Sequence, residues 1–163
     1  MSAPDSPPAV APATVDPRGV RFTAVLTTIV LVLVLLTGNG WLAVAQAVVF
    51  GLGAFAGLGY SLYAVLFRTL IAPRLGPPAD REDAAPVRFS QLVGFVFAVV
   101  AAVGYLTGAT TLGIVATALA LAAAFLNAAF GFCLGCEMYT LIARTRARVR
   151  ARNPHTTAEG ATA

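Results

Sequence analysis

The stretch VRFTAVLTTIVLVLVLLTGNGWLAVAQAVVF (Val20–Phe50) decides the fold, because it consists of two apolar runs joined by a short glycine-containing link. Arg21 stands near its start, and no other residue of the stretch is charged. An α-helix of about 20 apolar residues is long enough to cross the hydrocarbon core of a membrane. The stretch therefore predicts a pair of transmembrane helices.

The composition of the whole chain favours lipid as the solvent. Of the 163 residues, 58% are hydrophobic and 11% are charged, whereas soluble domains carry about 25% charged residues. Charged side chains are costly in hydrocarbon, which explains their scarcity in membrane segments. The formal net charge of +4 is not accompanied by a basic and aromatic surface, so nucleic-acid binding is not expected.

The arginines predict the orientation. Four apolar segments are expected as helices, at residues 20–37, 41–67, 89–106 and 112–142. All 11 arginines lie before or at the very start of the first segment, between the second and third, or after the fourth, and none lies in the two short links. The positive-inside rule then predicts an all-α protein of the cell (inner) membrane, with four transmembrane helices and both termini in the cytoplasm.

Two tails flank the expected transmembrane domain, which covers residues 16–144. Residues 1–15 are rich in proline and alanine, and we expect them to be disordered. Residues 145–163 begin with alternating arginines. We expect this second tail to lie in the cytoplasm on the anionic headgroups of the lipid bilayer.

The chain repeats itself. Asp16 and the run V-R-F-T that begins at Val20 recur as Asp83 and the run V-R-F-S that begins at Val87. Residues 58–68 and 134–144 share the pattern L-G-x-x-x-Y-x-x-x-x-R. Two helical hairpins with the same orientation form a parallel repeat, related by an axis along the membrane normal. Because the first helix is the counterpart of the third, we expect it to be retained rather than removed as a signal peptide.

Small residues recur along the second and fourth segments at spacings of three and four, and Gly53 and Gly57 form a G-x-x-x-G motif. Such rows allow two helix backbones to approach closely. We expect the second and fourth helices to pack on each other and to bring Gly57 close to Cys133. A contact between two copies in a homodimer is the alternative.

The only two cysteines, Cys133 and Cys136, form a C-x-x-C motif followed by Glu137. They are too few for a disulfide scaffold or for a four-ligand zinc site in one chain, although two chains of a dimer would supply enough thiols. Helix geometry places them near the cytoplasmic boundary of the membrane, where a resting dithiol is expected. If Gly131 breaks the fourth helix, Cys133 gains the N-terminal dipole that favours a thiolate, whereas Glu137 opposes it.

Three stretches resemble a bacterial membrane family known as domain of unknown function 4395, over about residues 15–144. They are Asp16-Pro17-Arg18, the run P-V-R-F-S-Q from Pro86, and above all the run N-A-A-F-G-F-C-L-G-C from Asn127. The resemblance implies a multi-pass membrane protein without an established activity. It also implies an association with thioredoxin-like and sulfur-transfer proteins.

The expected chemistry is thiol–disulfide exchange or sulfur transfer with a thioredoxin-like or rhodanese-like protein. Cys133 and Cys136 are the expected catalytic pair, with Glu137 as modulator. Asn127, Arg21 and Arg88 are expected to line a substrate path or to give polar support. Two alternatives stay open, namely a small permease for a sulfur-containing anion and a structural subunit whose cysteines only pack. The sequence assigns no cofactor.

Overall fold

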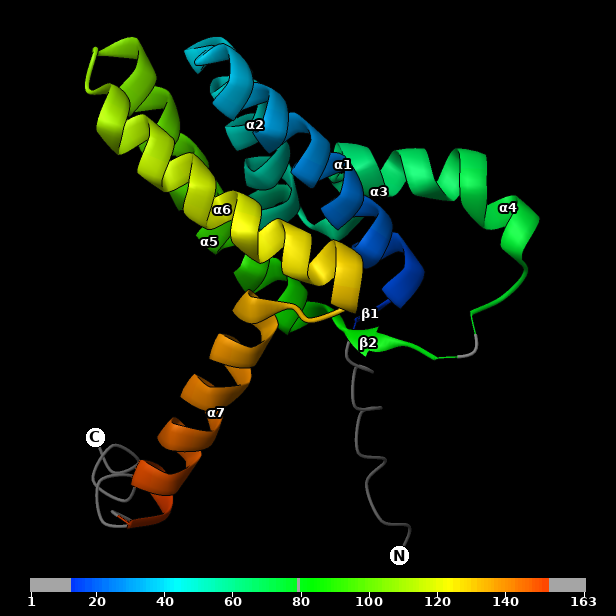
Figure 1. The fold of residues 1–163 in the computed structure, drawn as a ribbon. Coiled ribbons are helices and arrows are strands. Elements are labelled where there is room, and N and C mark those ends of the chain that lie inside the picture. Colours follow the sequence, from blue (N-terminus) through cyan, green and yellow to red (C-terminus); the bar gives the residue numbers. More distant parts are fainter. Residues whose placement is uncertain (1–12, 79, 153–163) are drawn as a thin grey trace, which may run out of the picture.

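The computed structural model describes residues 13–78 and 80–152 and is almost entirely helical (Figure 1). The N-terminal tail expected to be disordered lies outside the described residues up to residue 12. Its last part forms strand β1 (Thr14–Val15), which pairs antiparallel with β2 (Glu82–Asp83). The pairing joins the two stretches that precede the repeated helix starts.

Within residues 13–78 and 80–152, three helices are long and apolar enough to cross a membrane, namely α1 (Pro17–Thr37), α5 (Ala84–Leu106) and α6 (Thr110–Phe130). Large side chains in the middle of these helices stay exposed: Ile29, Val96 and Leu119 are 52%, 53% and 54% exposed. An apolar surface of this extent requires an apolar solvent. The chain is therefore a multi-pass membrane protein.

Asp16 starts α1 as its N-cap. Its carboxylate accepts a hydrogen bond from the backbone N–H of Arg18 at 2.9 Å and forms an ion pair with the Arg18 guanidinium at 3.1 Å. Burial raises the pKa of Asp16, but the hydrogen bonds and positive charge of Arg18 outweigh that effect, so the pKa lies below its ordinary value. The Arg18 guanidinium also donates to the carbonyl oxygens of Leu75 and Gly76.

The second apolar segment is not one continuous helix. It begins as α2 (Gly40–Gly51), which continues into a π-helical turn (Leu52–Ala56). This continuous helical part ends at Gly57, which has φ of +110° and ψ of 156°. Backbone in this region is accessible essentially only to glycine. The prediction of a helix over 41–67 is therefore wrong, and a four-span arrangement remains a prediction.

Beyond Gly57 the chain turns sideways relative to α1 (Figure 1). A short series of helical turns follows, made up of a 3₁₀ turn (Leu58–Tyr60), α3 (Leu62–Leu66), a π-helical turn (Phe67–Ile71) and α4 (Ala72–Leu75). The fourth segment is interrupted in the same way, because Gly131 ends α6 with φ of +69°. Helix α7 (Leu134–Arg152) then leaves in a new direction. Its C-terminal half belongs to the expected tail, whose residues 153–163 lie outside the described ones.

The repeat is visible in the positions of these breaks. In both halves the chain leaves its helical path directly before the repeated L-G motif, at Gly57 in the first half and at residues 131–133 in the second. Each half also packs on the other. Helix α2 of the first half packs on α5 of the second, and α6 of the second half packs on α1 of the first as well as on α5. The two breaks therefore fall at equivalent positions of the two halves, while the relation of the halves as two membrane hairpins stays a prediction.

The predicted contact between the second and fourth segments is wrong. Among the described residues, α2 and α6 make no extended contact, because α5 lies against both. The small residues of α2 and its π-helical turn face α5 instead: a Cβ on Gly53 would lie 3.1 Å from Oε1 of Gln91. A Cβ on Gly57 would meet no heavy atom of the described structure within 4 Å, so Gly57 does not face Cys133.

Candidate functional site around the cysteine pair

Cys133 and Cys136 form a disulfide, with their Cα atoms 5.2 Å apart. Cys133 directly precedes α7, and its carbonyl oxygen accepts a hydrogen bond of 3.0 Å from the backbone N–H of Glu137. Cys136 lies in the first turn of the helix. Both cysteines are half-buried, whereas Glu137 is exposed. The close approach of the two cysteines fits a C-x-x-C pair that can form a disulfide, and the resting dithiol expected from a cytoplasmic position stays a prediction.

Gly131 is the residue that places the pair at a helix start. Its backbone N–H donates to the carbonyl oxygen of Asn127 at 3.0 Å, and its left-handed conformation ends α6. Glycine is the usual residue at such a C-terminal position because it lacks a Cβ. Cys133 consequently lies at the N-terminus of α7. There the unpaired N–H groups and the helix dipole favour a negatively charged sulfur.

The first turns of α7 are held tightly against α5. A Cβ on Gly135, between the two cysteines, would lie 2.6 Å from the Cβ and 2.8 Å from the Cα of Ser90. One turn further on, the rings of Phe89 and Tyr139 lie 5.8 Å apart. The glycine of the C-x-x-C motif thus permits a close helix contact that fixes the position of the disulfide.

A polar pocket of about 330 Å³ lies beside the disulfide. It brings together most of the residues predicted for the site: Arg21, Asn127, Cys133, Cys136 and Glu137. Thr140, Glu82 and Asp83 also line it. The pocket lies between α1, β2 and the start of α7, so it is built from both halves of the repeat.

Arg21 and Arg88 occupy equivalent positions in the repeat but have different surroundings. The Nε atom of Arg21 lies 3.9 Å from the position that a Cβ on Gly131 would occupy. Arg21 is therefore close to the non-helical residues 131–133 between α6 and α7. The guanidinium of Arg88 instead donates to the carbonyl oxygen of Ala54 at 3.0 Å. Arg88 therefore stabilises the end of the α2 segment and does not line the polar pocket.

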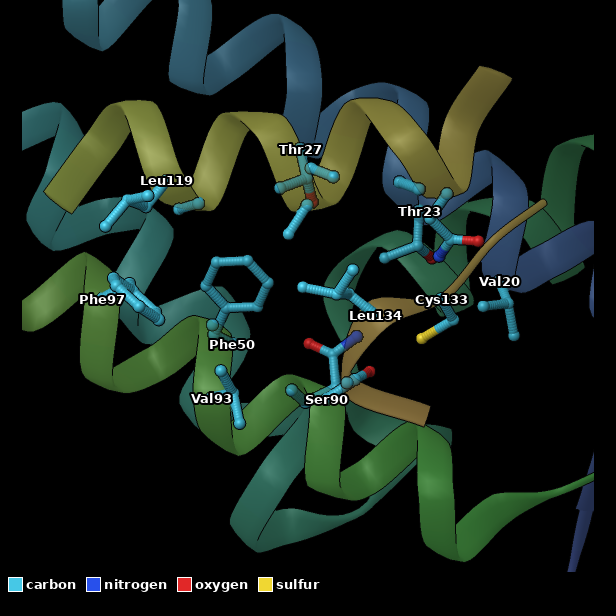
Figure 2. A pocket seen from close by; sticks show the side chains of 18 of the residues that line it. Val20, Thr23, Thr27, Phe50, Ser90, Val93, Phe97, Leu119, Cys133 and Leu134 are labelled. Atoms are coloured by element: carbon cyan, nitrogen blue, oxygen red, sulfur yellow. The ribbon is translucent and has the colours of Figure 1, made fainter. Parts of the chain in front are cut away.

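An apolar cavity of about 330 Å³ lies on the other side of Cys133, between α1, α5, α6 and the start of α7, with Phe50 of α2 also lining it. Figure 2 shows the Cys133 sulfur toward one end of this cavity, with Phe97 and Leu119 toward the other and Phe50 between them. Cys133, Asn127 and Val20 line both the apolar cavity and the polar pocket. Cys133 therefore stands at the boundary between the two spaces.

Two buried amides in the apolar helices were missed by the sequence analysis. Gln46 is 1% exposed, accepts a hydrogen bond of 2.9 Å from Tyr63 and donates one of 3.5 Å to Thr27. Gln91 lines the apolar cavity, and its Oε1 is buried without a hydrogen-bond partner among the described residues. The signal that identified Asn127, an amide within an apolar run, would have identified both glutamines.

Comparison with known proteins identifies the family. The model of the family described as Domain of unknown function (DUF4395) matches residues 15–144. The chain therefore belongs to the DUF4395 family. Neither the curated proteins nor the solved structures contain a match to this chain.

Proposed function

We propose that this member of the DUF4395 family is a four-span protein of the inner membrane that exchanges disulfides with a soluble thioredoxin-like protein in the cytoplasm. The observation that carries the proposal is the Cys133–Cys136 disulfide at the start of α7, beside a pocket that contains Arg21 and Glu137. A C-x-x-C motif at a helix N-terminus, next to an arginine, is the environment in which cysteines become reactive.

The arrangement of the helices supports a cytoplasmic location for the pair. The α1–α2 and α5–α6 links lie together at one end of the molecule, while β1–β2 and α7 lie at the other (Figure 1). The α1–α2 and α5–α6 links contain no arginine, and the arginines of the chain are concentrated toward the end that carries α7. Positively charged flanks stay preferentially in the cytoplasm.

Exchange begins with attack on Cys136, which lines only the polar pocket. The partner's thiolate attacks the Cys136 sulfur, so a mixed disulfide forms and the Cys133–Cys136 bond breaks. Cys133 leaves as a thiolate, and the N-terminus of α7 stabilises it as a leaving group. The partner's second thiolate then attacks the mixed disulfide and releases Cys136. Two electrons have passed to the pair, and two protons from the partner's thiols complete the dithiol.

Trapping of the mixed disulfide tests the proposal. With Cys133→Ala and a thioredoxin-like partner whose own second cysteine is replaced by serine, no thiol remains to resolve a bond between Cys136 and the partner, so a mixed disulfide should accumulate. Cys136→Ala should trap much less, because Cys133 is shared between the polar pocket and the apolar cavity, whereas Cys136 lines only the polar pocket. Non-reducing electrophoresis followed by mass spectrometry of the trapped species measures both, with the double Cys→Ala protein as control.

Two results would contradict thiol–disulfide exchange. The cysteines act only as packing residues if reduced protein in intact membranes takes up no maleimide and the double Cys→Ala protein supports growth and sulfur use normally. An extra sulfur atom on either cysteine, found by mass spectrometry without any mixed disulfide, would favour sulfur transfer instead.

A further inference from the structure

The apolar cavity reaches the lipid-facing surface of the protein. Three of its lining residues, Leu119, Leu134 and Met138, are 54%, 44% and 44% exposed, so they form a rim toward the hydrocarbon. Inside this rim the walls are mostly apolar, with Phe50 and Phe97 across the cavity from α6 (Figure 2). Its volume of about 330 Å³ falls within the range of about 300–1,000 Å³ of small-molecule sites.

The polar groups of the cavity are few, and one of them has no partner. Thr23, Thr27, Ser90, Gln91 and Asn127 are the polar side chains that line it. Gln91 is 9% exposed, and its Oε1 is buried without a hydrogen-bond partner among the described residues. A buried unpaired carbonyl oxygen costs free energy, so a ligand that donates a hydrogen bond to it would be stabilised.

We propose that the apolar cavity binds the ring of a lipid-soluble quinone, which reoxidises the Cys133–Cys136 dithiol. This inference rests on the proposed disulfide exchange, because the exchange leaves two electrons on the pair that must be passed on. Cys133 is the residue through which they leave, since it lines the apolar cavity as well as the polar pocket. A quinone is the class of membrane-soluble molecule that accepts two electrons and two protons together.

The proposed step balances. The S–H bonds of Cys133 and Cys136 break, the S–S bond forms, and the two electrons and two protons convert the two carbonyl groups of the quinone to hydroxyl groups. A side-chain amide has both a carbonyl acceptor and N–H donors. Gln91 therefore suits both forms of the ligand, because its amide donates to a quinone carbonyl and its Oε1 accepts from a quinol hydroxyl.

The test uses the full-length protein in lipid nanodiscs. The pair is reduced with dithiothreitol, the reductant is removed, and decylubiquinone or a short-tailed menaquinone is added without oxygen. We expect the absorbance of the oxidised quinone to fall by the amount that corresponds to one quinone reduced for each cysteine pair. Maleimide-reactive thiols should be lost in the matching amount. Ala120→Leu, which fills the cavity, should slow this step roughly tenfold or more, the scale on which methylene-sized misfits act in apolar sites.

Ala118→Leu is the matched control, because Ala118 is exposed on the same helix and does not line the cavity. It should leave the rate unchanged. Ala120→Leu must retain the wild-type rate of exchange with reduced thioredoxin, which shows that the variant is folded. The inference is overturned if the wild type reduces quinone no faster than the double Cys→Ala protein, or if Ala120→Leu reduces it at the wild-type rate.

Exchange with thioredoxin, measured on the same preparations, separates this inference from the proposed function. Exchange without quinone reduction overturns the quinone site and leaves the proposed function standing. Failure of both reactions overturns both. Quinone reduction that depends on both cysteines and is lost in Ala120→Leu supports the inference.

Discussion

Two side chains of opposite charge, Arg21 and Glu137, line the polar pocket together with Cys133 and Cys136. Positive charge favours the thiolate, and negative charge opposes it. We expect Glu137→Gln to increase the rate of maleimide alkylation of the reduced pair at neutral pH by about twofold to fivefold, and Arg21→Gln to decrease it similarly, as is usual for partly exposed charges. Stopped-flow alkylation measures both.

Thr140→Ser serves as the control for that prediction, since Thr140 lines the same pocket without carrying a charge. A decrease in the exchange rate of Glu137→Gln without a change in alkylation would assign Glu137 a different role. Its carboxylate would then act as the base that accepts a thiol proton during exchange.

Gly135 and Gly59 are equivalent glycines of the repeated L-G motif, but their surroundings differ. A Cβ on Gly135 would lie 2.6 Å from the Cβ of Ser90, whereas one on Gly59 would meet only the Arg68 guanidinium, at 3.9 Å. We expect Gly135→Ala to destabilise the protein by about 1 to 3 kcal/mol, because α7 must move away from α5. Gly59→Ala should be close to neutral. Thermal unfolding in detergent compares them.

The double variant Gly135→Ala/Ser90→Gly tests whether the close contact between these two residues causes the loss of stability. If the close contact is the cause, Ser90→Gly should restore part of the stability lost in Gly135→Ala by removing the nearest atom. Equal destabilisation by Gly135→Ala and Gly59→Ala would instead indicate that the contact between α5 and α7 contributes nothing.

At the level of helices, Gly57 is important for its backbone conformation and not for close packing. Its φ of +110° is strongly unfavourable for any other residue, but no atom lies within 4 Å of a Cβ placed there. We therefore expect Gly57→Ala and Gly57→Leu to destabilise equally, each by about 1 to 3 kcal/mol. Unfolding of both variants in detergent measures this. A much larger loss for leucine would show that a neighbouring helix packs at this position.

The sequence predicted the apolar segments well and their interruptions poorly. Glycine occurs within membrane helices without breaking them, so hydropathy alone did not distinguish Gly53, which lies inside a helical turn, from Gly57, where the helix ends. Gly131 was recognised only as a possible break. The distinction depends on the sign of φ, which is set by the packing of the elements on either side.

Site residues could be predicted where they are close in sequence or where they are polar within an apolar run. Cys133, Cys136 and Glu137 are close in sequence, and the C-x-x-C motif itself marked them. Arg21 and Asn127 were singled out for their charge and polarity in apolar surroundings, and the fold brings them to the same pocket. The apolar cavity was missed, because it is formed by residues of five helices from both halves of the chain.

The whole molecule is organised around α5, which packs against α2, α6 and α7. Because α2 of the first half packs on α5 of the second, and α6 of the second half packs on α1 of the first, neither hairpin forms the bundle alone. The disulfide lies where α7 meets α5 and lines a pocket that α1 also lines. The position of the cysteine pair therefore depends on the assembly of both halves.

The remaining question at this scale is whether the α2 segment crosses the membrane. The apolar helix Gly40–Ala56 spans about 25 Å at 1.5 Å per residue, against a hydrocarbon core of about 30 Å. Local thinning of the bilayer can accommodate such a mismatch at modest cost. With the orientation given by the arginines, we expect this segment to cross as the second of four spans.

Reporter fusions after Gly40, Pro78, Thr110 and Arg150 measure the topology. Four spans predict a periplasmic reporter at the first and third sites and a cytoplasmic one at the second and fourth. If the α2 segment does not cross, Pro78 and Arg150 become periplasmic and Thr110 becomes cytoplasmic, while Gly40 is unchanged and serves as the internal control. That second pattern would place Cys133 and Cys136 on the oxidising side of the membrane, and the exchange partner would have to be sought in the periplasm.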